Sequence, residues 1–234
     1  MSHSFQAKLI WAHQHMEALR WDILAFARLE PYVVVHEFHP ERSKHIWRVD
    51  GPLLIPPQQI SLRLGDTLYN YRGVLDHLIW DLVLASGGIP TEITAFPICG
   101  TLKQWKSARV QRQIAGIHED LVARIEALQP YNGRYPDSPN EILGLLNRLG
   151  NVEKHRHFNL IAAAVELACF TVDTDALAYS FIHKGPVEDD TVLAIAEGKV
   201  DVDFIPAPGV AFGQGGDAPG KLVNELMLLI EFAV

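Results

Sequence analysis

The feature that most constrains the fold is a long stretch, Gln58–Ser86, whose apolar residues recur every three or four positions. This apolar stripe consists of Leu64, Leu68, Tyr71, Leu75, Leu78 and Leu82. Such spacing is typical of a helix that buries one face, and Gly87-Gly88 would end it. Because no other stripe in the chain is as long, we expect Leu68, Leu75 and Leu78 to be almost fully buried.

Other segments show the same helical periodicity. Phe5–Leu29 repeats Leu9, Ala12, Met16, Leu19, Ile23 and Phe26 before Pro31, and Asn140–His155 repeats Ile142, Leu145, Leu149 and Val152. Ser138 or Asn140 would cap the second of these helices, because short polar side chains accept hydrogen bonds from a helix's first amides. Three shorter helices are expected at Leu102–Lys106, His118–Leu128 and Leu222–Val234.

Strand-forming segments are rich in β-branched and aromatic residues and are bounded by turn residues. Tyr32–Phe38 and His45–Val49 predict a hairpin. An antiparallel sheet is expected from Phe158–Val172, Ala176–His183, Thr191–Glu197 and Val200–Phe212, although the first run can also be interpreted as a helix. The chain is therefore expected to be one α+β domain over residues 1–234, in which a helical bundle packs beside an antiparallel β-sheet. It would be mostly helical over 1–157, with the hairpin near 32–49, β-rich over 158–212, and helical again over 222–234.

Composition narrows the classes of function. The chain of 234 residues is 48% apolar and 21% charged, which is ordinary for a globular protein. A net charge of −8 argues against general nucleic-acid binding, so any RNA contact would have to be local. Cys99 and Cys169 lack a CxxC partner and suit a reducing compartment. Met1–Trp11 does not have the pattern of a signal peptide, and no window approaches the ~18 apolar residues of a membrane-spanning helix, so we expect a cytoplasmic location and no membrane contact.

Two polar stripes could carry chemistry. Asp66, Asn70, Gly73 and His77 share one side of the long helix, at steps of four, three and four. Arg148, Asn151 and His155 share one side of the later helix, which continues as Lys154-His155-Arg156-His157. We place a candidate site between these two helices. A polar stripe on an amphipathic helix is, however, most often a solvated face, and Arg72 with Asp76 is best interpreted as an intrahelical ion pair.

Several passages resemble a group of uncharacterised bacterial and actinobacterial proteins. They are LRLGDTLYNYRGVLDHLIW (62–80), FPI (96–98), LQPY (128–131) and LNRLGNVEKHR (146–156). This resemblance covers most of residues 1–160 and carries no established activity. In addition, Arg148 and His155 are similar to the Arg-x(4–6)-His motif of the HEPN superfamily of helical ribonucleases and nucleotide-binding proteins.

The HEPN resemblance implies a metal-independent ribonuclease. His155 would act as base or acid, Arg148 would hold phosphate, and Asn70 or Asp66 would orient the histidine. Lys154 and Arg156 would add local positive charge for RNA, with His77 and Asn151 as further binding residues. In that superfamily the motif lies across a dimer interface, so a homodimer would form the site.

The alternatives to a ribonuclease are a metal site and a binding module. His77, His155 and His157 with Asp66 or Asp76 offer suitable ligand types, but residues two apart on a helix point in different directions, so we expect neither a metal nor another cofactor. The primary hypothesis is a binding or structural module, with a small molecule or protein as its partner.

Overall fold

The computed structural model describes residues 4–133, 138–153, 158–170, 177–198, 203–213, 218 and 220–233. By their contacts the residues form two compact units. Unit 1 comprises Met1–Leu19, Leu62–His157 and Leu226–Val234, and unit 2 comprises Arg20–Ser61 and Phe158–Glu225. The helices and antiparallel strands confirm the α+β class, whereas the expected single domain over residues 1–234 stays a prediction.

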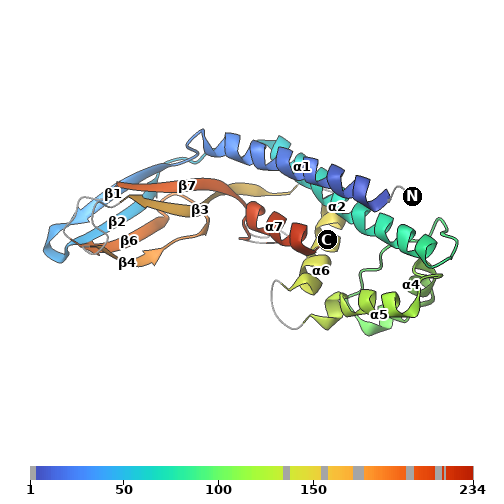
Figure 1. Cartoon of the computed structure of the whole chain (residues 1–234). Coiled ribbons are helices and arrows are strands. Elements are labelled where there is room, and N and C mark those ends of the chain that lie inside the picture. The colour runs from blue at the N-terminus through green and yellow to red at the C-terminus, as the bar shows by residue number, and fades with distance from the viewer. Residues whose placement is uncertain are drawn as a thin grey trace. The chain divides into compact units, whose positions relative to one another are not determined.

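The described part of unit 1 is built mainly from helices (Figure 1). Its elements are α1 (Ser4–Ala27, shared with unit 2), α2 (Gln58–Ala85, likewise shared), α3 (Leu102–Trp105), α4 (Ala108–Gln113), α5 (Glu119–Ala127), the 3-10 turn η2 (Pro130–Asn132), α6 (Pro139–Glu153) and α7 (Val223–Ala233, shared). Ser138 caps α6 as expected, since its Oγ accepts a hydrogen bond from the Glu141 amide at 3.4 Å. The sequence did not predict α4, a helix of only six residues.

The buried face of α2 follows the predicted stripe through its first half. Leu68 and Leu75 are 0% and 3% exposed, which confirms the expectation for them, whereas Leu78 is only partly buried. Val83 is buried instead, because the C-terminal half of α2 meets the backbone of a neighbouring loop: a Cβ placed on Gly88 would lie 2.9 Å from both Val83 Cγ1 and the Gly116 carbonyl. In the C-terminal half of α2 the buried side is therefore the one that carries Val83 and faces Gly88 and Gly116.

Arg72 and Asp76 form the predicted i,i+4 ion pair on α2, with Nη1 and Oδ1 3.1 Å apart. Both side chains also hold the backbone of Phe96. Arg72 Nη2 donates to the Phe96 carbonyl at 2.7 Å, and Asp76 Oδ1 accepts from the Phe96 amide at 2.9 Å. Burial lowers the pKa of Arg72, an effect that the charge of Asp76 opposes. The pair thus fastens the loop that follows α2 back onto the helix.

Unit 2 contains two antiparallel sheets instead of the single sheet that the sequence suggested. The first has the strand order β1 (Val33–His39), β2 (Lys44–Asp50), β6 (Val192–Gly198) and β4 (Leu177–Ile182), and the 3-10 turn η1 (Pro40–Arg42) joins β1 to β2 (Figure 1). The second has the order β5 (Gly185–Pro186), β3 (Leu160–Phe170) and β7 (Asp203–Phe212). The hairpin is confirmed, and the run that could have been helix or strand is strand β3.

The segment between β4 and β6 leaves the first sheet, pairs briefly with the second, and returns. Within it β5 pairs with β3, with Pro186 opposite Ala163. Gly185 adopts a φ of 126°, a backbone conformation that favours glycine. We call residues 183–191 the β4–β6 connection.

Tyr32 fixes the start of the hairpin to β3. Its side chain is buried, and its hydroxyl donates to the Ala163 carbonyl at 3.4 Å. Burial raises the pKa of Tyr32 to about 12, because the ionised phenolate would lose its hydration.

No α-helix among those described combines the length and the apolar character needed to cross a bilayer.

Candidate functional site

The polar stripe of α2 is present, but its members have separate roles. Asn70 is buried, accepts a hydrogen bond from Lys8 Nζ at 2.7 Å and donates to the Asp66 carbonyl at 2.7 Å. Asp66 and His77 are exposed, and His77 Nδ1 lies 3.2 Å from Ser4 Oγ. Asn70 is therefore occupied with joining α1 to α2, which is a structural role.

On α6, Arg148 and Asn151 are exposed. The third member of that stripe, His155, lies outside the described residues, as do its neighbours Lys154, Arg156 and His157. The pairing of Arg148 with His155, the RNA contact and the homodimer stay predictions. Within the described ranges, no group of three or more His, Cys, Asp or Glu side chains is arranged to hold a metal ion.

A cavity lies within unit 2. It has a volume of about 570 Å³ and is open to solvent. Its walls come from the segment after β2, from the start of β3 and from the β4–β6 connection: Leu53, Leu54, Ile55, Pro56, Leu160, Ile161, Ala162, His183, Pro186, Val187, Glu188 and Thr191. Nine of these twelve residues are apolar, and the three polar ones all belong to the connection.

Backbone hydrogen bonds hold the walls of the cavity in place. The Val187 amide donates to the Ala162 carbonyl at 3.1 Å, and the Leu54 amide donates to the Pro31 carbonyl at 2.8 Å. At the far end of the connection, the Val49 amide donates to the Thr191 carbonyl at 2.9 Å. A wall that is fixed in this way provides a preformed surface for a ligand.

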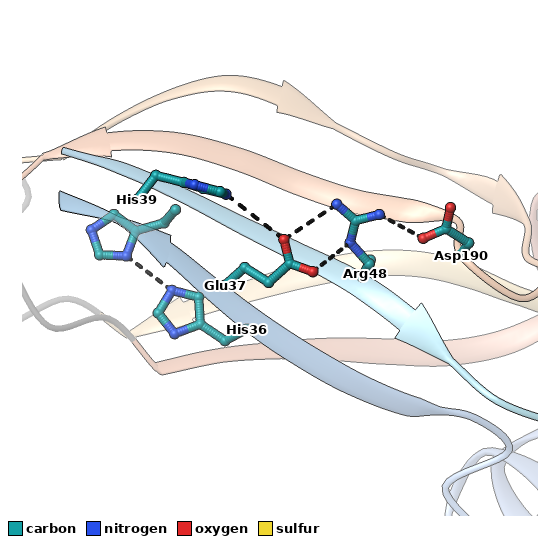
Figure 2. Close-up of polar contacts among 6 residues, drawn as sticks. His36, Glu37, His39, Arg48 and Asp190 are labelled. Atoms are coloured by element: carbon teal, nitrogen blue, oxygen red, sulfur yellow. Dashed lines mark hydrogen bonds and ion pairs between the residues drawn. The ribbon is translucent and has the colours of Figure 1, made fainter. Parts of the chain in front are cut away.

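A charged cluster on the first sheet clamps the same connection (Figure 2). Arg48 Nη1 donates to Asp190 Oδ1 at 2.5 Å, and Arg48 Nε lies 3.1 Å from Glu37 Oε1. The hydrogen bond to Asp190 is the main cause of a raised Arg48 pKa. Asp190 itself has a φ of 66°, and its amide donates to the Val49 carbonyl at 3.0 Å. These contacts hold the turn at Asp190, which is part of the β4–β6 connection, against β2.

Two histidines hold the hairpin together on neighbouring strands. His45 is buried and its Nε2 lies 3.2 Å from the Gly198 carbonyl, which can only accept, so Nε2 carries the proton. In neutral His45 the Nδ1 atom is then the acceptor for His36 Nε2 at 2.9 Å (Figure 2). This pair links the edge strand β1 to the buried side of β2.

His183 is the pocket histidine, and one hydrogen bond fixes its tautomer. Its Nε2 lies 2.8 Å from the Pro186 carbonyl, so Nε2 donates and, in the neutral ring, Nδ1 keeps its lone pair. Thr191 Oγ1 accepts from the Glu188 amide at 2.9 Å. The polar side of the cavity thus offers an imidazole nitrogen, a carboxylate and a hydroxyl.

The sequence did not predict this cavity, since Ala176–His183 was expected only as a strand and no site was expected near His183 or Leu53–Pro56. The available signals were weak: the run Leu53-Leu54-Ile55 is apolar although prolines surround it, and a Gly-Pro pair directly follows His183-Lys184.

The chain matches no family model, no curated protein and no solved structure.

Proposed function

We propose that the chain is a binding protein whose unit 2 takes up a small, mainly apolar molecule in the cavity beside the β4–β6 connection. The observation that carries this proposal is the cavity itself, with about 570 Å³ of space and predominantly apolar walls. Pockets for small molecules commonly have volumes of roughly 300–1,000 Å³, apolar linings and a few polar groups.

Exposed apolar side chains at the cavity support the proposal. Ile55 is 85% exposed and Leu54 is 46% exposed, although both line the cavity. Adjacent apolar side chains that face both solvent and a cavity favour a ligand that removes them from water. Because hydrogen bonds already fix the walls, such a ligand would not have to order the connection on binding.

The test is titration with N-phenyl-1-naphthylamine, an uncharged apolar fluorophore that brightens when it leaves water. We expect saturable binding at one site per chain. Ile55→Asn should weaken binding by about three- to tenfold, which corresponds to roughly 0.7–1.4 kcal/mol. The matched control is Ile89→Asn, since Ile89 is 87% exposed and does not line the cavity.

Comparing the two variants distinguishes binding in the cavity from adsorption of the fluorophore to the protein surface. If the two asparagine variants weaken binding equally, or if the wild-type signal never saturates, the fluorophore is not in this cavity and the proposal is wrong. A thermal melt of each variant verifies that both fold as the wild type does.

A further inference from the structure

The polar groups of the cavity are mainly hydrogen-bond acceptors. His183 donates its Nε2 proton to the Pro186 carbonyl, which leaves Nδ1 as an acceptor in the neutral ring. No described residue donates a hydrogen bond to that atom. The Glu188 carboxylate is exposed and, within the described ranges, forms no ion pair. Both groups are therefore available to a ligand that donates.

The basic side chains that belong to the described connection or are bound to it, Lys184 and Arg48, are already ion-paired. Neither lysine nor arginine is among the lining residues. Lys184, next to the pocket histidine, is paired with Glu225. Arg48 is held between Asp190 and Glu37.

The connection itself is acidic, because Glu188, Asp189 and Asp190 follow one another. Asp189 Oδ1 accepts from the Gly51 amide at 2.9 Å, and Asp190 is bound to Arg48. Glu188 is thus the carboxylate of this run that lines the cavity without a described charged partner. Its negative charge attracts a cation and repels an anion, and its oxygens can also accept a hydrogen bond from a neutral donor.

We infer that the ligand is a primary amine, with an ammonium head group on its apolar body. The Glu188 carboxylate and His183 Nδ1 would accept the hydrogen bonds of that head group. This inference rests on the proposed function. The head group would lie at the β4–β6 connection and the apolar body against Leu53–Pro56 and the start of β3. A fatty acid or another carboxylate of the same size would place its negative charge beside Glu188 and would be repelled.

The experiment compares three probes that share one apolar body: 4-phenylbutylamine, 4-phenylbutan-1-ol and 4-phenylbutanoate. At pH 8 the first is a cation, the second is neutral and the third is an anion. Calorimetric titration of the full chain should rank them amine, alcohol, carboxylate, with the amine at least about tenfold tighter than the carboxylate.

Two variants locate the source of this preference. Glu188→Gln should reduce amine affinity by about three- to tenfold and leave alcohol affinity within about twofold. Glu41→Gln removes the same charge from the exposed turn η1 and should change neither. An equal effect of both variants would show a long-range effect of net charge and would overturn the assignment of Glu188.

The outcomes distinguish this inference from the proposal beneath it. If none of the three probes binds and the fluorophore does not bind either, the proposed function is wrong. If the fluorophore binds in the cavity but the carboxylate binds as tightly as the amine, or Glu188→Gln leaves amine affinity unchanged, the proposed function stands and the head-group inference is wrong.

Discussion

Arg48 on β2 and Asp190 in the β4–β6 connection are joined by a hydrogen bond of 2.5 Å between Nη1 and Oδ1, across 142 positions of sequence. Arg48 lies at the end of β2 where the register of pairing with β6 shifts. The bond therefore lies at the end of the regular pairing between β2 and β6, next to the start of the connection.

Replacing Arg48 should loosen the connection. Arg48→Met removes the donor to Asp190 and leaves Asp190 and Glu37 without their shared cation. We expect the Asp190 amide, which donates to the Val49 carbonyl, to exchange its hydrogen several-fold faster, as measured by hydrogen–deuterium exchange. Arg42→Met, in the exposed turn η1, is the control and should leave this exchange rate unchanged. Unchanged exchange in Arg48→Met would show that the other bonds of the turn, such as those of Asp189 and Thr191, are enough to fix it.

Leu75→Ala should cost about 2–5 kcal/mol of unfolding free energy, because it opens a cavity beneath a side chain that is 3% exposed. Leu84→Ala on the same helix, at a side chain that is 52% exposed, should cost well under half of that. Urea unfolding of both variants measures the difference. Similar losses at the two positions would contradict the assignment of the buried face of α2.

Asp76→Ala should destabilise unit 1 by about 1–3 kcal/mol. The change removes the acceptor of the Phe96 amide and the carboxylate beside the partly buried Arg72 guanidinium. Asp66→Ala provides a matched loss of charge at an exposed position on the same helix and should be nearly neutral. Equal unfolding midpoints for the two variants would mean that the loop around Phe96 is held by other contacts.

Alkaline pH should destabilise the fold through Tyr32. Its pKa is about 12 in the folded chain and 10.0 when unperturbed, so the folded state holds the phenolic proton more tightly. The stabilisation is complete below pH 10 and is lost as the pH rises from 10 to 12, by at most about 2–3 kcal/mol. Tyr32→Phe should reduce this fall, as followed by unfolding free energy across that window. A slope identical to that of the wild type would show that Tyr32 ionises freely in the folded state.

The sequence was informative where structure depends on local spacing. The periodicity of Leu64, Leu68 and Leu75 predicted the long helix and its buried face, and the β-branched run around Val34 predicted the hairpin. It did not predict the full burial of Val83, because that depends on where the backbones of Gly88 and Gly116 pass. Such contacts between distant segments leave no periodic pattern in the sequence.

The candidate cavity could not be predicted for the same reason. It exists because Gly185 and Pro186 pair with β3, and two residues are too few to produce a recognisable strand pattern. Asn70 and Arg148 do lie on helices as predicted, on α2 and α6, whereas the placement of His155 stays a prediction because it lies outside the described residues. Spacing alone could not reveal that Asn70 is already bound to Lys8.

The interleaving of the two units along the chain has a consequence for how the protein is made. Unit 1 takes residues both from Ser4–Leu19 and from Leu226 onward, while unit 2 draws on Arg20–Ser61 and Phe158–Glu225. During synthesis, unit 2 cannot be completed before Phe158–Glu225 has been made. Unit 1 supplies the earlier residues Ser4–Leu19 but also needs those from Leu226 onward. Unit 1 cannot gain the contribution of α7, with its buried Leu226, Met227 and Ile230, before residues from Leu226 onward have been made, and we expect part of its apolar surface to stay exposed until then.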